Sequence, residues 1–106
     1  MEMRIAKLGL CSGRHDLPAV KDGYVFDEIE DVTDVQGLEL HALCVLKNLK
    51  NVTSRHIDLY VTGLTVALIA FLNAVRIDRN YTVTLWHYNS ATGEYFAQPV
   101  EDWVEY

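Results

Sequence analysis

The chain has 106 residues, half of them apolar and 23% charged, and its formal net charge at pH 7 is −6. This length suits a single domain over residues 1–106 with one hydrophobic core. The acidic balance argues against duplex nucleic acid as a partner, because a basic surface is needed to neutralise its phosphates. The longest apolar run, residues 66–72, is too short to cross a membrane.

In chain order, the first predicted element is a strand over residues 3–11, where alternating apolar and polar residues give way to an apolar run. A loop with glycine and proline follows at residues 12–18. Residues 24–29 form either a short strand or an extended connection. The acidic residues between 27 and 34 are interpreted as a solvated surface, and they precede a helix from about Val35 to Leu49 with Asp34 as its N-cap.

The second half of the chain alternates strand and helix. It predicts a strand at residues 57–61, a helix at about 64–76, a strand at 81–88, a turn at 89–93 and a returning strand at 94–98. We therefore expect a small Rossmann-like α/β domain with three layers. Its sheet should be mainly parallel, with an antiparallel hairpin at the C-terminal end.

Ligands of such sheets bind beyond the carboxyl ends of the strands. If the first, third and fourth strands run parallel, three segments meet at that edge. They are the loop Ser12–Gly13–Arg14–His15, the turn Thr62–Gly63–Leu64–Thr65 and the strand end His87–Tyr88–Asn89.

The turn at residues 62–65 leads from a buried strand into an apolar helix, so the first backbone N–H groups of the helix lack partners within it. With the helix dipole, these groups favour a phosphate or another anion. A purely structural interpretation stays open, in which Gly63 allows close strand–helix packing and Thr65 caps the helix.

The other two segments carry side chains suited to a nucleotide. Arg14 offers a planar fork for phosphate, and His15 and His87 offer ring nitrogens. Tyr88 combines a stacking surface with a hydrogen-bonding edge, and Tyr95 is a weaker candidate of the same kind. The alternatives are that Arg14 and His15 are solvated and that the hairpin aromatics only pack across strands.

The sequence contains no strong catalytic or metal-binding motif. The four histidines lack metal-ligand spacing, and Cys11 and Cys44 form no Cys-x-x-Cys pair, so we expect no metal and no cofactor. Ser12 with His15 or His87 is a conceivable nucleophile and base, but the sequence does not place them together. Residues 1–4 lack the pattern of a secretion signal, so a cytoplasmic location is expected.

The order strand, Thr62-Gly63-Leu64-Thr65 turn, apolar helix and strand with a glycine-bearing hairpin resembles the C-terminal half of CRISPR-associated Rossmann-fold (CARF) sensor domains. The resemblance covers residues 57–95. The family reads Thr-Gly-Gly-Thr followed by lysine at this turn, whereas this chain has Leu64 and Val66 at those two places. The resemblance implies a cyclic oligonucleotide messenger as the ligand.

Residues 8–15, 59–65 and 87–95 also resemble small proteins of bacteriophages. Together the resemblances imply a counter-defence "sponge" that sequesters a signalling nucleotide in the host cytoplasm. Phosphate contacts are then expected from Arg14, Ser12–Gly13 and Thr62–Thr65, and base or ribose contacts from His15, His87, Tyr88 and Asn89.

Two other functions stay open at this point. One is a ring-nuclease-like phosphodiesterase that cleaves the same messenger, with His15 or His87 assisting. The other is a protein–protein adaptor that uses its acidic stretch. For a binding domain of this size we also expect a homodimer or a larger symmetric assembly, with residues 102–106 as a candidate interface.

Overall fold

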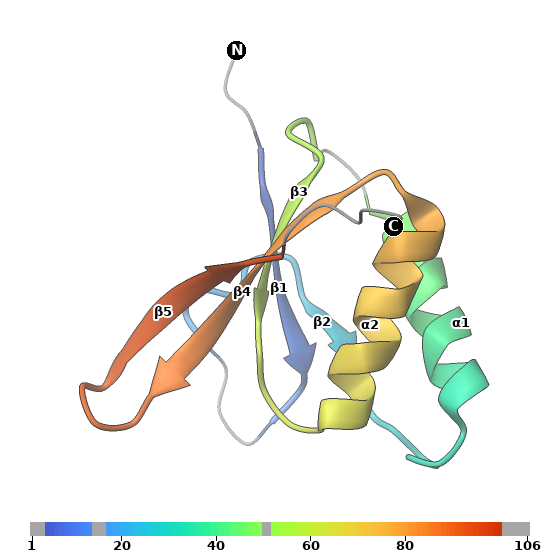
Figure 1. The fold of residues 1–106 in the computed structure, drawn as a ribbon, viewed down its shortest axis with the longest axis horizontal. Helices are drawn as coiled ribbons and strands as arrows, with labels where there is room; N and C mark the ends of the chain where they lie inside the picture. The colour runs from blue at the N-terminus through green and yellow to red at the C-terminus, as the bar shows by residue number, and fades with distance from the viewer. Residues whose placement is uncertain (1–3, 14–16, 50–51, 101–106) are drawn as a thin grey trace, which may run out of the picture.

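The computed structural model describes residues 4–13, 17–49 and 52–100, which form two helices and one five-stranded sheet (Figure 1). In chain order the elements are β1 (Ala6–Cys11), β2 (Tyr24–Phe26), α1 (Val35–Lys47), β3 (His56–Tyr60), α2 (Thr65–Asp78), β4 (Thr82–Asn89) and β5 (Glu94–Pro99). Every element predicted within the described residues is confirmed, and residues 24–29 form a three-residue strand with an irregular continuation.

The strands lie in the order β2-β1-β3-β4-β5. The first four run parallel, and β5 pairs antiparallel with β4. This confirms an α/β domain with a mainly parallel sheet and an antiparallel hairpin, an arrangement compatible with a Rossmann-like fold. The order also reverses direction at the boundary between β1 and β3, which in sheets of this kind is the place where a ligand crevice opens.

The core lies between the sheet and both helices. Alternate residues of the strands point toward the helices, and small residues on α2 allow the layers to approach closely. The fully or nearly fully buried members are Ala6, Leu8 and Leu10 on β1, Val25 and Phe26 on β2, Ile57 and Leu59 on β3, Val83 and Leu85 on β4, Leu38, Ala42 and Leu46 on α1, and Ala67, Ala70, Phe71, Ala74 and Val75 on α2.

Helix α1 begins where the sequence predicts. The Asp34 carboxylate accepts a hydrogen bond from the Gly37 N–H at 3.1 Å, which confirms Asp34 as the N-cap. Helix α2 ends at Arg79, whose left-handed backbone (φ 62°) lets its N–H donate to the Val75 carbonyl at 2.9 Å.

Both helices pack against the same side of the sheet (Figure 1). In a doubly wound sheet, the connection from β1 to β2 runs opposite to the later ones, so its helix would cover the other side. The described residues of that connection, 12–13 and 17–23, contain no helix. A three-layer arrangement is therefore not confirmed, and we call the side of the sheet opposite α1 and α2 the helix-free face.

The connection instead runs back along β1 and is held there by polar contacts. Asp22 accepts a hydrogen bond from the Lys7 N–H at 2.8 Å and forms an ion pair with Arg4. Partial burial works against the charged form of Asp22, but the Lys7 and Arg4 contacts outweigh it and hold its pKa below the usual value. Nearby, the Tyr24 ring lies over Gly9, where any side chain would collide with it.

Within the described residues, no helix has the length and apolar character needed to span a membrane.

Candidate functional site

The carboxyl ends of β1 and β3 lie side by side, as predicted. The two strands are parallel neighbours, with Gly9 opposite Tyr60, so Ser12–Gly13 and the turn at residues 62–65 leave the sheet at one edge (Figure 1). Arg14 and His15 lie outside the described residues. The structure thus brings together two segments of the predicted phosphate site at the point where the strand order reverses.

Thr62 ties this edge together. Its hydroxyl accepts a hydrogen bond from the Cys11 N–H at 3.1 Å and donates one to the Cys11 carbonyl at 2.6 Å. The side chain therefore continues the pairing of β1 with β3 beyond the last backbone pair. This is a structural role, and it engages the hydroxyl that the sequence suggested for a ligand.

Both the backbone conformation at position 63 and the space beside it require glycine. Its φ is +82°, and a Cβ at this position would lie 3.0 Å from the Cys11 Cβ and 3.1 Å from its Sγ. The Cys11 thiol beneath it is half-buried. Burial raises the pKa of this thiol, and a hydrogen bond from the Leu64 amide only partly opposes the rise. Cys11 is therefore a neutral packing group at neutral pH and not an activated nucleophile.

The start of α2 has no side-chain cap. The N-cap is Leu64, in an extended conformation, and its side chain makes no capping hydrogen bond. The interpretation of Thr65 as the cap is therefore wrong: Thr65 is the first helical residue and its side chain is exposed. The Leu64 N–H donates to the Cys11 thiol and the Ala67 N–H to the Leu64 carbonyl, so within the described residues the Thr65 and Val66 N–H groups are the ones that an anion could use.

The third predicted segment does not join this edge. The last pair between β3 and β4 is Tyr60 with Trp86, so residues 87–89 pair only with β5. The tip of the β4–β5 hairpin extends beyond β3 and away from the start of α2 (Figure 1). The Asn89 side chain accepts a hydrogen bond from the Ala91 N–H at 3.0 Å and so stabilises its own turn. His87 Nε2 lies 2.8 Å from Gln98 Oε1.

Tyr88 belongs instead to a group of rings on the helix-free face. We call Tyr60, Trp86, Tyr88 and Tyr95 the aromatic cluster. The ring centroid of Tyr60 lies 6.0 Å from that of Trp86, in a stacked arrangement, and 5.4 Å from that of Tyr95, in an edge-on one. The centroids of Tyr88 and Tyr95 are also 5.4 Å apart.

The cluster has a buried side and an open side. Tyr60 is buried, and burial, the nearby Asp58 charge and Tyr95 raise its pKa. The Trp86 indole N–H is also buried and has no hydrogen-bond partner among the described residues. Tyr88, by contrast, is 57% exposed. The cluster therefore offers an accessible ring at its edge and an unused donor within.

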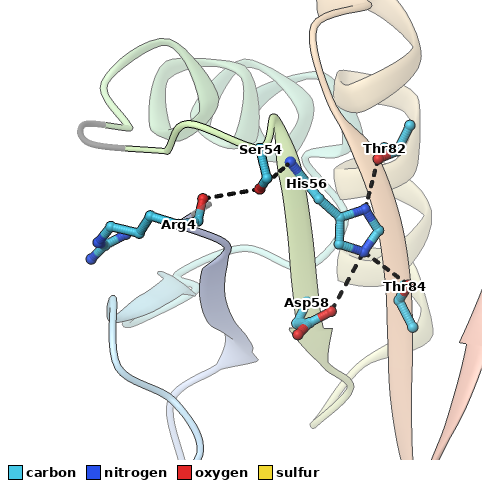
Figure 2. Close-up of polar contacts among 6 residues, drawn as sticks. All are labelled: Arg4, Ser54, His56, Asp58, Thr82 and Thr84. Atoms are coloured by element: carbon cyan, nitrogen blue, oxygen red, sulfur yellow. Dashed lines mark hydrogen bonds and ion pairs between the residues drawn. The ribbon is translucent and has the colours of Figure 1, made fainter. Parts of the chain in front are cut away.

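The register of β3 with β4 places a second group beside it on the same face. Figure 2 shows this group. We call His56, Asp58, Thr82 and Thr84 the polar cluster. His56 Nδ1 is 2.6 Å from Thr82 Oγ1, and its Nε2 is 3.0 Å from Thr84 Oγ1 and 3.5 Å from Asp58 Oδ1. Within the described residues, no group of three or more histidine, cysteine, aspartate or glutamate side chains has the arrangement of a metal site.

Sequence reasoning missed the helix-free face because it treated residues 57–61 as a strand buried on both sides. The signal was nevertheless present. Residues 56, 58 and 60 alternate with apolar core residues, and residues 82, 84 and 86 do the same. Two parallel neighbouring strands with this alternation place their non-core side chains together on one face.

Comparisons with protein-family models, with curated proteins and with solved structures found no match to this chain.

Proposed function

We propose that this protein binds a signalling nucleotide, with cyclic oligonucleotides as the first candidates, and holds it without converting it. The observation that carries the proposal is the aromatic cluster, which lies on the helix-free face where β3 leads into the Thr62–Thr65 turn and has Tyr88 exposed at its edge. Aromatic rings on an open sheet bind bases by stacking, and this binding tolerates an overall acidic protein when the ligand is small.

The edge of the sheet supplies a complementary feature. The uncapped start of α2 favours negative charge, and Gly63 keeps side chains away from the backbone there. A cyclic oligonucleotide bound along this region would place one base against the rings and a phosphate of another of its nucleotides toward the helix start. Under the same proposal, the protein acts in the cytoplasm of a phage-infected host as a sponge for a defence messenger.

A thermal-shift screen of the full chain tests this function. The panel holds cyclic di-, tri- and tetranucleotides and messengers of the ADP-ribose type. A ligand that binds only the folded state stabilises it by about 2.7 kcal/mol at a hundredfold excess over Kd. Each ligand that raises Tm is then incubated with the protein, released by heat and identified by mass spectrometry. Intact ligand is expected.

A pair of exposed aromatic residues provides the matched control. Tyr88 belongs to the aromatic cluster, whereas Phe96 is 51% exposed on the opposite face of the same hairpin. Loss of one stacked ring costs about 1–3 kcal/mol, so Tyr88→Ala should weaken binding about tenfold while Phe96→Ala leaves it unchanged. Equal effects of the two substitutions, or no Tm shift with any nucleotide, would contradict the proposal.

One observation favours cleavage as a second candidate. His56 is an imidazole held in a fixed orientation on the same face, with Asp58 beside it, and a bound hydroxyl that replaces Thr84 at Nε2 could give its proton to this ring. Recovery of linear or cut product in the screen, lost in His56→Gln, would identify a ring-nuclease-like enzyme. A tight protein partner with no small ligand would instead favour the adaptor.

A further inference from the structure

The register of β3 with β4 arranges the helix-free face in three successive pairs. His56 lies opposite Thr82, Asp58 opposite Thr84 and Tyr60 opposite Trp86. Because same-face residues of a strand are two positions apart, neighbouring pairs are about 7 Å from one another. The polar cluster therefore lies a single step along the strands from the aromatic cluster. The ribose of a nucleoside is bonded directly to its base, so a base against Trp86 would place its sugar over the neighbouring pair of Asp58 and Thr84, whereas the exposed ring of Tyr88 lies one step further along the strand.

The polar cluster is held rigidly. A neutral imidazole has one donor and one acceptor nitrogen, and a threonine hydroxyl can fill either role. Thr82 and Thr84 contact one ring nitrogen each, so together they fix the plane of His56 (Figure 2). Ser54 supports the start of the strand, since its hydroxyl donates to the Arg4 carbonyl at 2.9 Å and accepts from the His56 N–H at 3.2 Å.

Asp58 retains the capacity to accept further hydrogen bonds. Its side chain is only 14% exposed, yet its contact with His56 Nε2, at 3.5 Å, is longer than a normal hydrogen bond. An ionised carboxylate has about four lone-pair positions for donors. A partly buried carboxylate accepts hydroxyl groups strongly and repels phosphate. The polar cluster is therefore chemically suited to sugar hydroxyls and unsuited to the phosphates of the same ligand.

We infer that Asp58, positioned beside His56, accepts the ribose 2′-hydroxyl of a nucleotide whose base lies against the aromatic cluster, so that this face selects ribonucleotides over deoxyribonucleotides. The inference rests on the proposed function and narrows its ligand to the ribo class. The 2′-hydroxyl is the group that distinguishes the two kinds of nucleotide. Its hydrogen bond to a charged acceptor is also stronger than one between neutral groups.

The test compares two sets of probes on the full chain by isothermal titration calorimetry. One set consists of 3′,5′-linked cyclic di-, tri- and tetra-adenylate and guanylate, and the other of the same rings built from 2′-deoxynucleotides. The wild-type protein should bind at least one ribo ring about tenfold or more tightly than its deoxy counterpart. Asp58→Asn should bring the ratio close to one by weakening only the ribo ring. Asp27→Asn, an exposed carboxylate after β2, should preserve the ratio.

The outcomes separate this inference from the function on which it rests. Equal affinity of the wild-type protein for ribo and deoxy rings overturns the inference and leaves nucleotide binding intact, and this comparison needs no variant. Equal weakening of both rings in a folded Asp58→Asn protein overturns it as well, since that result would mark a structural role. Binding of no ring from either set overturns both the inference and the proposed function for cyclic nucleotides.

Discussion

Gly63 lies in a conformation and a space that both exclude a side chain. Its φ of +82° costs a non-glycine residue about 1–2 kcal/mol, and the Cys11 side chain occupies the place of a Cβ. We expect Gly63→Ala to lower the free energy of unfolding by about 1–3 kcal/mol, measured by urea denaturation.

Gly13 is the matched control, because a Cβ there has no atom within 4 Å. Gly13→Ala should therefore change stability by less than about 0.5 kcal/mol. Similar destabilisation by both substitutions would mean that the Gly63 turn does not depend on close packing against Cys11.

At the same scale, the sequence locates the Thr62–Thr65 turn correctly but not the role of each residue. The partner of the Thr62 hydroxyl is Cys11, 51 residues earlier in the chain, and no local pattern reveals such a contact. The residue types of His87 and Asn89 favour ligand contacts. In the structure their side chains serve the hairpin, a role that depends on where β4 extends beyond β3.

At the scale of elements, the aromatic cluster is what joins the hairpin to the rest of the sheet on the helix-free face. Tyr95 of β5 contacts Tyr60 of β3 as well as its neighbour Tyr88. We expect Tyr95→Ala to increase amide hydrogen exchange at residues 87–96, because the hairpin loses its contact with β3, while α1 and α2 keep their protection.

Phe96→Ala supplies the comparison, since Phe96 lies on the other face and contacts His87. It should leave exchange in the hairpin close to that of the wild type. Uniform loss of protection over the whole chain in Tyr95→Ala would show that Tyr95 belongs to the global core instead.

The elements themselves are predictable because apolar periodicity is strong in both halves of the chain. The alternation at residues 82–86 indicates a strand, and Asp34 before an apolar helix indicates an N-cap. The short β2 is ambiguous because three residues show too little of any period. Which side of β3 faces water does not follow from the sequence either, since that depends on how many helices the connections supply.

At the scale of the whole molecule, the architecture depends on the β1–β2 connection, whose described residues 12–13 and 17–23 contain no helix. Alternating strands and helices predict the α/β class, but the strand order depends on long-range pairing. The order β2-β1-β3-β4-β5 emerges only when the β1–β2 connection turns back along β1. The number of layers depends on that connection, and the face with the aromatic and polar side chains has no helix over it among the described residues.

The outer side of the helical layer bears on the expected homodimer. Leu40 of α1 is 64% exposed and Ile77 of α2 is 60% exposed, and both border the same shallow groove between the helices. A two-fold axis over this groove would bury both residues in each subunit. We therefore expect sedimentation velocity to show a dimer for the wild type and a monomer for Leu40→Glu. Val32→Glu, an exposed loop substitution, should remain dimeric. A monomeric wild type would contradict this assembly.

Because the Cys11 thiol lies next to Gly63, its reaction with an alkylating reagent can measure the accessibility of the Thr62–Thr65 turn. Cys11 lies half-buried under the turn, whereas Cys44 is exposed on α1. The turn shields one side of the Cys11 thiol, so the rate of its alkylation relative to that of Cys44 reports how accessible this edge of the sheet is. Cys44 reacts in the same sample and supplies an internal reference. A molecule bound over the turn would slow the alkylation of Cys11 and leave that of Cys44 unchanged. The ratio of the two rates would therefore measure the bound fraction with an unlabelled ligand.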